Sequence, residues 1–284
     1  MPETPETLRI ALVQMTSADS HAPNIAELER VAAEAAADGC AMLAMPEVAG
    51  LMNRHLVPDQ SPLGDEANDP YITACREVAE RHGLWIHTGS TPILRNGDSR
   101  FLNHSNLIDA TGRIVAAYDK IHLFDIHPPG RDPILESRRY APGRHTVLAE
   151  TPWGPLAMSI CYDLRFPQLY REYAQDGAAF LMIPSAFTVP TGKKHWAILL
   201  RARAIETGAF VIAAAQTGTH EDGRKTYGHA MVVAPSGKIL ADLGTKPGWR
   251  AVDLDLSAIE AARQEIPSLS HDRSYSRLPG RALD

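Results

Sequence analysis

Three residues whose side chains can take part in covalent catalysis stand directly after apolar stretches of the sequence. Glu47 follows the run at 40–45, Lys120 ends the second arm of a predicted hairpin, and Cys161 follows the run at 156–160. Because ligands of open sheets tend to bind beyond the carboxyl ends of the strands, we expect these three side chains to lie close together. Alone, each also has an ordinary interpretation as a solvated acid, a surface cation or a core thiol.

Together the three residues make a set that can hydrolyse a bond to a carbonyl carbon. A cysteine attacks as its thiolate, and Glu47 could remove the proton of Cys161. A helix beginning at Tyr162 would direct its positive end at the sulfur. The backbone N–H of Tyr162 and the ammonium of Lys120 could hold the oxyanion of a tetrahedral intermediate, which makes Tyr162 a predicted substrate-binding residue. The set predicts acyl transfer through a thioester, followed by hydrolysis with water.

Other kinds of site have weaker support in the sequence. His122, Asp125 and His127 lie near one another, as do His220 and His229, but zinc sites have tighter helical or hairpin spacing. No G-x-S-x-G occurs, and PTGKK lacks the upstream glycine of a nucleotide-binding P-loop. We therefore expect neither a metal nor another cofactor.

The composition is that of an ordinary globular protein. The chain has 284 residues, of which 44% are hydrophobic and 22% charged, and its formal net charge is -6. No long run of one sign occurs, so we expect no nucleic-acid partner and no anionic membrane surface. Three cysteines are too few for a disulfide framework and favour a reducing compartment. Without a signal peptide or an apolar stretch near the roughly 20 residues of a membrane span, we expect a soluble cytoplasmic protein.

Strands and helices alternate along the chain in a pattern that occurs twice. Each half is predicted to contain three strands separated by two helices and followed by a hairpin. The strands are expected at 9–15, 40–45, 84–90, 156–160, 178–186 and 210–218, the helices at 24–39, 71–83, directly after Cys161 and at 195–208, and the hairpins at 102–120 and 228–244. Strands that are apolar on both faces are typical of sheets covered by helices. The sequence thus predicts an α/β fold in which two mixed sheets pack face to face between outer helices.

The domain organisation follows from the lack of any linker or low-complexity segment. We expect a single domain over residues 1–284. The tail from about residue 267 is rich in arginine and poor in apolar residues. It is predicted to be an arm that lies over a surface of its own or a partner subunit.

Three motifs resemble those of the nitrilase-like carbon-nitrogen hydrolase family: MPE at 45–47, YDKIHLFD at 118–125 and SICYDLRFPQLYRE at 159–172. The resemblance implies an α-β-β-α sandwich, in agreement with the duplicated pattern. It also implies that Glu47 is the general base, that Lys120 stabilises the tetrahedral intermediate and that Cys161 is the nucleophile. The family's second glutamate matches Glu136 in PILESRRYAPG, where it would hold the lysine or orient the substrate. Family members commonly form homodimers or higher homo-oligomers.

Within the family, the segment at 184–239 resembles the Nit branch and, in it, the deaminated glutathione amidases. This resemblance implies a small-molecule amide substrate, namely deaminated glutathione, which would be hydrolysed to 2-oxoglutarate and cysteinylglycine. The segment departs from the branch at Lys194 and Ala197, where a small residue and a glutamate are expected, and in VVAPSG, which lacks the usual Asp and Trp. The alternatives are an ω-amidase acting on α-ketoglutaramate, an N-carbamoyl-amine hydrolase and, outside enzymes, a binding scaffold.

Candidates for substrate binding follow the cysteine and occur again in the later segment. Arg165, one helical turn after Cys161, could bind an α-keto carboxylate, or it could pair with an acid such as Asp163 or Glu172. Lys193 and His195 could meet a distal carboxylate of the substrate, although such a loop is often simply solvated.

Overall fold

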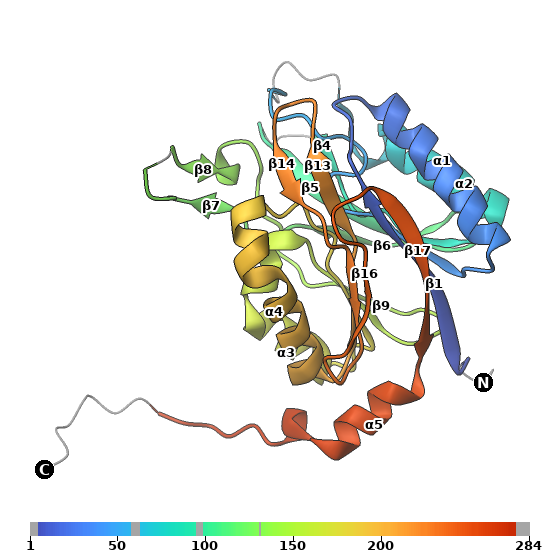
Figure 1. Cartoon of the computed structure of the whole chain (residues 1–284), viewed down its shortest axis with the longest axis vertical. Coiled ribbons are helices and arrows are strands. Elements are labelled where there is room, and N and C mark those ends of the chain that lie inside the picture. The colour runs from blue at the N-terminus through green and yellow to red at the C-terminus, as the bar shows by residue number, and fades with distance from the viewer. Residues whose placement is uncertain (1–4, 58–62, 95–98, 131, 277–284) are drawn as a thin grey trace, which may run out of the picture.

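The computed structural model describes residues 5–57, 63–94, 99–130 and 132–276. Two sheets pack face to face. One outer face is covered by α1 (His21–Ala37) and α2 (Pro70–His82), and the other by α3 (Pro167–Gln175) and α4 (Val189–Thr207) (Figure 1). This arrangement confirms the predicted α-β-β-α sandwich. No helix within the described ranges is long and apolar enough to cross a membrane.

The first sheet has nine strands and comes mainly from the first half of the chain. They are β1 (Thr7–Met15), β2 (Met42–Ala44), β3 (Trp85–His87), β4 (Thr91–Leu94), β5 (Phe101–Ile108), β6 (Ile114–Asp119), β13 (Ala215–Thr219), β14 (Lys225–Tyr227) and β17 (Gly248–Asp255). Their order is β14-β13-β1-β2-β3-β5-β4, with β17 paired to β1 and β6 to β5. β1 is parallel to β2 and antiparallel to β17, so the sheet is mixed.

β1 illustrates why a strand near the middle of this fold is apolar at almost every position. Leu8, Ile10 and Leu12 belong to the core between the two sheets, whereas Ala11 and Val13 belong to the core beneath α1 and α2. Successive side chains of a strand point to opposite faces. A strand that is covered on both sides therefore shows a continuous apolar run instead of alternation.

The second sheet has six strands and comes from the second half of the chain. Its strands, in sheet order, are β16 (Ile239–Asp242), β15 (Met231–Val233), β12 (Phe210–Ala213), β11 (Phe180–Met182), β10 (Leu156–Met158) and β9 (Leu148–Ala149). The predicted late hairpin is confirmed, because β15 and β16 are antiparallel neighbours. The early hairpin is confirmed as well, because β5 and β6 pair in the same way.

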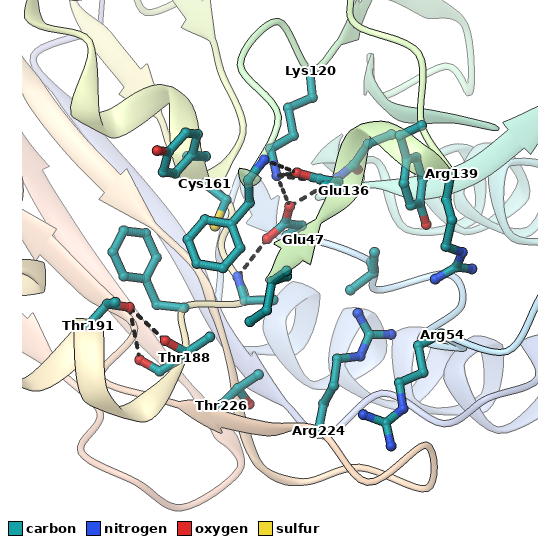
Figure 2. A pocket seen from close by; sticks show the side chains of 18 of the residues that line it. Glu47, Arg54, Lys120, Glu136, Arg139, Cys161, Thr188, Thr191, Arg224 and Thr226 are labelled. Carbon is teal, nitrogen blue, oxygen red and sulfur yellow. Dashed lines mark hydrogen bonds and ion pairs between the residues drawn. The ribbon is translucent and has the colours of Figure 1, made fainter. Parts of the chain in front are cut away.

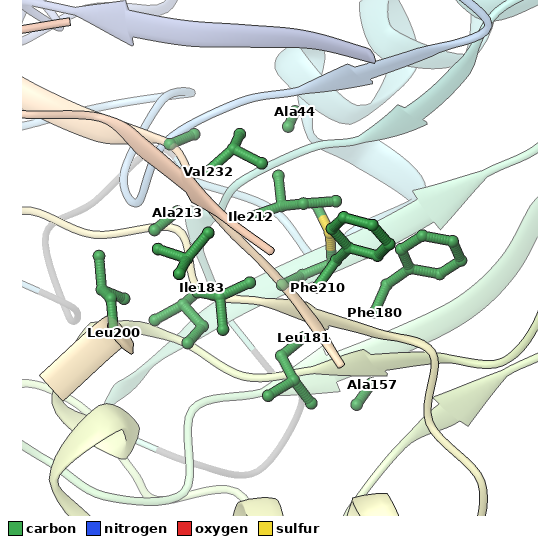
Figure 3. Close-up of a cluster of buried hydrophobic side chains, with 14 of the residues drawn as sticks. Ala44, Ala157, Phe180, Leu181, Ile183, Leu200, Phe210, Ile212, Ala213 and Val232 are labelled. Atoms are coloured by element: carbon green, nitrogen blue, oxygen red, sulfur yellow. The ribbon is translucent and has the colours of Figure 1, made fainter. Parts of the chain in front are cut away.

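The core between the sheets is made of aliphatic and aromatic side chains from both. Figure 3 shows Ala44 of β2 in one cluster with Phe180, Phe210 and Ile212 of the second sheet, and each of the four is at most 1% exposed. Burying a side chain of the larger kind contributes about 1.5–3 kcal/mol relative to leaving it in water. This layer therefore holds the two sheets at a fixed position relative to one another.

The prediction of one strand over residues 210–218 is wrong, because the chain changes sheets at Ala214. β12 ends at Ala213 in the second sheet, and β13 begins at Ala215 in the first. Ser185, which follows β11, makes an isolated bridge with Ala215. The two sheets are therefore joined by a continuous backbone at this point as well as by side-chain packing.

The helix predicted directly after Cys161 consists of two pieces. Cys161–Arg165 forms a short 3₁₀ turn, and α3 begins only at Pro167. Phe166 between them has φ -110° and ψ 86°, because a proline disfavours the α conformation in the residue before it. The prediction that an α-helix N-terminus points at the Cys161 sulfur is therefore wrong.

The C-terminal part contains two elements that the sequence analysis does not anticipate. One is β17, which pairs with β1 from Asp255 opposite Thr7 to Gly248 opposite Gln14. The other is α5 (Ser257–Glu265), followed by a 3₁₀ turn (Ser268–Ser270).

The described part of the predicted arm, residues 267–276, contacts this chain's own α3. Arg171 of α3 forms an ion pair with Asp272 and donates a hydrogen bond to the carbonyl of Ser268 at 2.9 Å. Residues 277–284 of the arm lie outside the described residues.

Candidate active site

A cavity of about 410 Å³ opens where both sheets contribute loops, and it holds the four predicted catalytic residues. Glu47, Lys120, Glu136 and Cys161 all line it, and Figure 2 shows the two glutamates and the lysine meeting beside the cysteine. Residues separated by more than a hundred positions in the sequence are thus brought into one site. Their catalytic roles stay a prediction.

Cys161 stands on a sharp turn between β10 and the 3₁₀ segment. Its φ is 49°, in the left-handed region that residues other than glycine rarely occupy. Its backbone N–H donates to the carbonyl of Pro184 at 3.0 Å, which helps to hold the turn. Strained backbone of this kind persists only where the surroundings fix it, and it is common at active sites. Here the turn brings the thiol to the cavity wall, although the residue is only 7% exposed.

Lys120 lies between two carboxylates. It follows β6 directly, and its Nζ donates to Oε1 of Glu47 at 2.8 Å and to both carboxylate oxygens of Glu136 at 3.0 Å. Only 2% of Lys120 and 5% of Glu47 is exposed. A charged lysine buried this deeply needs such partners, because an unpaired buried charge is costly.

Glu47 is fixed through both of its carboxylate oxygens. Oε1 accepts a hydrogen bond from Nδ2 of Asn103 at 3.0 Å in addition to the one from Lys120. Oε2 accepts from the backbone N–H of Ala186 at 2.8 Å. The carboxylate therefore has one orientation in the cavity, as a proton-transfer group requires.

Glu136 lies in the segment of the chain that connects β6 of the first sheet to β9 of the second. β7 (Asp125–Ile126) and β8 (Ile134–Leu135) form a small antiparallel hairpin, and Glu136 begins the 3₁₀ turn that follows. The backbone N–H of Phe124 donates to Oε2 of Glu136 at 2.5 Å. This bond holds the turn that carries Glu136 to the residues that follow Lys120.

The charges of the site set the protonation states of Lys120 and Cys161. Burial disfavours the charged form of Lys120, but the carboxylates of Glu136 and Glu47 more than offset it and raise the pKa well above the ordinary value. Burial raises the pKa of Cys161, and the charge of Glu47 raises it further, against the opposing effect of Lys120. The resting site therefore holds a neutral thiol and a charged ammonium. Such a thiol needs a base during attack, and Glu47 is placed to act as one.

The four predicted substrate-binding residues divide into two groups. Tyr162 lines the cavity. Arg165, Lys193 and His195 are not among the lining residues, and Lys193 and His195 are exposed on α4, which begins at Val189, before the predicted start. The guanidinium of Arg165 lies 5.7 Å from the ring centre of Tyr162, and its Nη1 is 3.3 Å from Nδ1 of His195.

Asp163, one of the two acids suggested as a partner for Arg165, is engaged elsewhere. The carboxylate of Asp163 accepts hydrogen bonds from Tyr118 and His122. Arg165 instead packs over the ring of Phe187, with 5.4 Å between the guanidinium carbon and the ring centre. It lies behind two residues of the cavity wall, so its role in substrate binding rests on the sequence alone.

Sequence reasoning missed most of the polar residues that line the rest of the cavity. They are Asn103 and, farther from the thiol, Arg54, Arg139, Arg224, Lys225, Thr188, Thr191 and Thr226. These residues come from five parts of the chain, and no local spacing links them. Glu136 was found because it matches the family's second glutamate, whereas Arg139, three residues later in the same stretch, was assigned no role.

The histidines offered as possible metal ligands have other partners. His122 Nδ1 lies 2.7 Å from Asp163, and His220 Nε2 lies 2.8 Å from the hydroxyl of Thr226. Within the described ranges, no three His, Cys, Asp or Glu side chains form a group suited to a metal ion.

Comparison with known proteins gives concordant results. The carbon-nitrogen hydrolase family matches residues 9–264. A deaminated glutathione amidase of Yersinia enterocolitica is 37% identical over 280 residues, which cover 97% of this chain and 96% of that protein. The crystal structure of the C. elegans NitFhit protein is 36% identical with a TM-score of 0.88, and the match covers 95% of this chain and 66% of that chain.

A third comparison concerns the cysteine. An amidase mutant from Nesterenkonia sp. AN1 is 28% identical with a TM-score of 0.75, and the match covers 92% of this chain and 98% of that chain. Its structure shows the result of Michael addition of acrylamide at the active site cysteine.

Proposed function

Because the chain belongs to the carbon-nitrogen hydrolase family, we propose that it hydrolyses the amide of deaminated glutathione to 2-oxoglutarate and cysteinylglycine. The observation that carries the proposal is the similarity to a deaminated glutathione amidase over nearly the whole of both chains. The cavity supports it, because a thiol, a base and an ammonium meet there within hydrogen-bonding networks.

In the first step, Glu47 takes the proton from the sulfur of Cys161 while the sulfur forms a bond to the amide carbonyl carbon. The carbonyl π electrons move to oxygen, and the resulting oxyanion is held by the ammonium of Lys120 and the backbone N–H of Tyr162. Collapse of this intermediate breaks the C–N bond, and the departing amine takes the proton from Glu47. An acyl thioester on Cys161 remains.

In the second step, water attacks the thioester carbonyl and gives its proton to Glu47. The same two donors hold the second oxyanion. Collapse breaks the C–S bond, releases the acid and returns a proton from Glu47 to the sulfur of Cys161. Glu136 holds Lys120 in place throughout, through the two 3.0 Å contacts between them. The cysteine adduct in the related amidase from Nesterenkonia supports the choice of nucleophile.

The proposal is tested by comparing kcat/KM for deaminated glutathione, α-ketoglutaramate and an N-carbamoyl amino acid, with Cys161→Ala as the inactive control. We expect deaminated glutathione to be preferred. A preference for α-ketoglutaramate would reassign the protein as an ω-amidase. A preference for the carbamoyl compound would reject both amidase assignments and leave the cysteine chemistry standing, whereas activity on none would reject all three.

We further propose that the enzyme works in the cytoplasm as a homodimer or higher homo-oligomer. All three cysteines are free, which suits a reducing compartment. Ile198 and Ile205 on the outer face of α4 are 70% and 55% exposed, and an apolar helix face of this kind favours association. Light scattering after size exclusion should give a multiple of the 31.0 kDa chain mass. A monomeric mass at micromolar concentration would reject the oligomer.

A further inference from the structure

The far end of the cavity carries positive charge that the two-step chemistry does not use. Figure 2 shows Arg54, Arg139 and Arg224 grouped on the side of the pocket across from Cys161, with the two glutamates between. The three arginines come from three separate segments of the chain. Their convergence on one end of one cavity is the observation from which the inference starts.

These guanidinium groups have few acidic partners among the described residues. Arg224 pairs with Asp222 at 2.6 Å, and the same carboxylate accepts the backbone N–H of Arg54 at 2.9 Å. The side chain of Asp222 is fully buried and lies in the turn between β13 and β14. Its charge is occupied in holding this β13–β14 hairpin to the loop that carries Arg54. Among the described residues, one carboxylate is thus hydrogen-bonded at an end of the cavity that carries three guanidinium groups.

Arg139 is held in place but incompletely satisfied. Its guanidinium carbon lies 6.0 Å and 5.7 Å from the ring centres of Phe101 and Tyr140, and its Nη2 donates to the carbonyl of Asn53 at 3.0 Å. Its Nε is buried and has no hydrogen-bond partner among the described residues. A buried donor without an acceptor is costly. An anionic ligand in the cavity would accept from the terminal nitrogens of this guanidinium, which suits a carboxylate because it can donate two parallel bonds.

Arg54 and Arg224 lie toward the outside of the cavity and the thiol toward the inside. Cys161 and Lys120 are 7% and 2% exposed, whereas 37% of the Arg224 side chain is exposed and Arg54 is exposed as well. In a thioester mechanism, the amine product must leave before water can attack the acyl group. A leaving group that points to the mouth can depart while the acyl chain stays inside.

We infer that Arg54, Arg139 and Arg224 bind the free carboxylate of the leaving group, and that the enzyme is therefore adapted to amides whose amine half is a short peptide with a free C-terminus. The inference rests on the proposed function. It assigns the arginine end of the cavity to the amine product rather than to the acyl chain.

The experiment uses two substrates that form the same acyl-enzyme. Deaminated glutathione and α-ketoglutaramate both leave an α-ketoglutaryl thioester on Cys161, but only the first releases a carboxylate-bearing amine. We expect Arg54→Gln and Arg139→Gln to lower kcat/KM for deaminated glutathione by about 10- to 100-fold, as expected for hydrogen bonds to a charged group. For α-ketoglutaramate the change should stay within about 2-fold. Arg250→Gln, an exposed arginine of β17 outside the cavity lining, is the charge-matched control.

A third substrate isolates the carboxylate itself. In deaminated glutathione with its C-terminal carboxylate converted to a carboxamide, the wild-type enzyme should lose the same factor in kcat/KM, and the arginine variants should lose nothing further. Equal losses on deaminated glutathione and α-ketoglutaramate would overturn the inference, as would no loss on either. If the wild-type enzyme turned over neither compound, the proposed function would fail and the inference with it.

Discussion

The carboxylate of Asp163 accepts hydrogen bonds from both the backbone nitrogen and Nδ1 of His122, at 2.9 and 2.7 Å. Asp163 stands two residues after Cys161, and His122 stands two residues after Lys120. The same buried carboxylate accepts the hydroxyl of Tyr118 at 2.7 Å. One acid therefore connects the turn that carries Cys161 to the segment that carries Lys120.

This connection predicts that Asp163 positions the site without touching the substrate. Asp163→Asn replaces one carboxylate oxygen, an acceptor, with an NH₂ group, a donor. This donor would face the donor of either His122 or Tyr118, so the turn should shift relative to Lys120. We expect kcat to fall on the order of 100-fold with KM nearly unchanged, because small displacements of reacting groups are costly. The free energy of unfolding should fall by about 1–3 kcal/mol. Asp176→Asn, at an exposed helix end, is the control. Loss of stability with normal kcat would show a purely structural role.

Glu47 and Lys120 are predicted to act as one unit with the thiol. Glu47→Gln keeps the shape but removes the base, and Lys120→Ala removes an oxyanion donor worth about 2.7–4 kcal/mol. Because each is needed by the same steps, the double variant should be little worse than the poorer single variant. Steady-state kinetics of the three variants measure this. Additive losses would mean that the two residues act independently.

The three cysteines should differ in their reaction with iodoacetamide. Burial raises the pKa of Cys40 to about 11 and also raises that of Cys75, and neither residue lines the cavity. Cys161 lines it, so peptide mass spectrometry should find the label there first. Because the pKa of Cys161 is raised too, the rate of labelling should increase with pH from about 7 to 9 as more thiolate forms. A rate independent of pH in this range would indicate a thiolate at rest and contradict this charge balance.

His104 predicts a pH-dependent part of the stability. Its Nδ1 lies 2.7 Å from Asp119 and its Nε2 lies 2.8 Å from Glu66. Burial lowers the pKa of His104, but the bonds to the two carboxylates more than offset this and raise it to about 8. A pKa raised on folding adds stability that is complete below the unfolded value of about 6.5 and is lost as pH rises through 8.

The size of this effect is about 2 kcal/mol. Urea unfolding of the wild-type protein and of His104→Gln at about pH 6 and pH 9 measures it. The difference in unfolding free energy between the two proteins should be larger at the lower pH by that amount. A difference that does not change with pH would contradict the assignment.

The sequence allowed the fold class and the grouping of Glu47, Lys120 and Cys161 to be predicted because both depend on local patterns. Runs such as 40–45 are apolar at every position because the strand is covered on both faces, and the residues that follow such runs line one cavity. Pro167 was a visible sign that the helix after Cys161 is interrupted, because α3 begins at this proline.

The rest of the site could not be predicted because it depends on contacts between distant segments. The backbone N–H of Arg54 donates to the carboxylate of Asp222 in the β13–β14 hairpin. Arg139 donates to the carbonyl of Asn53, in the loop that carries Arg54. Nothing in the neighbourhood of either arginine in the sequence indicates a partner so far along the chain. Arg165 shows the converse error, because closeness to Cys161 in sequence did not place it in the cavity lining.

The place of β1 in the first sheet determines how this protein can be assembled during translation. β1 leaves the ribosome long before two of its partners, β13 and β17, are made. Until they arrive, an apolar strand edge stays open, and such edges invite pairing with other chains. Nascent or truncated chains that lack β13 and β17 should therefore depend on chaperones.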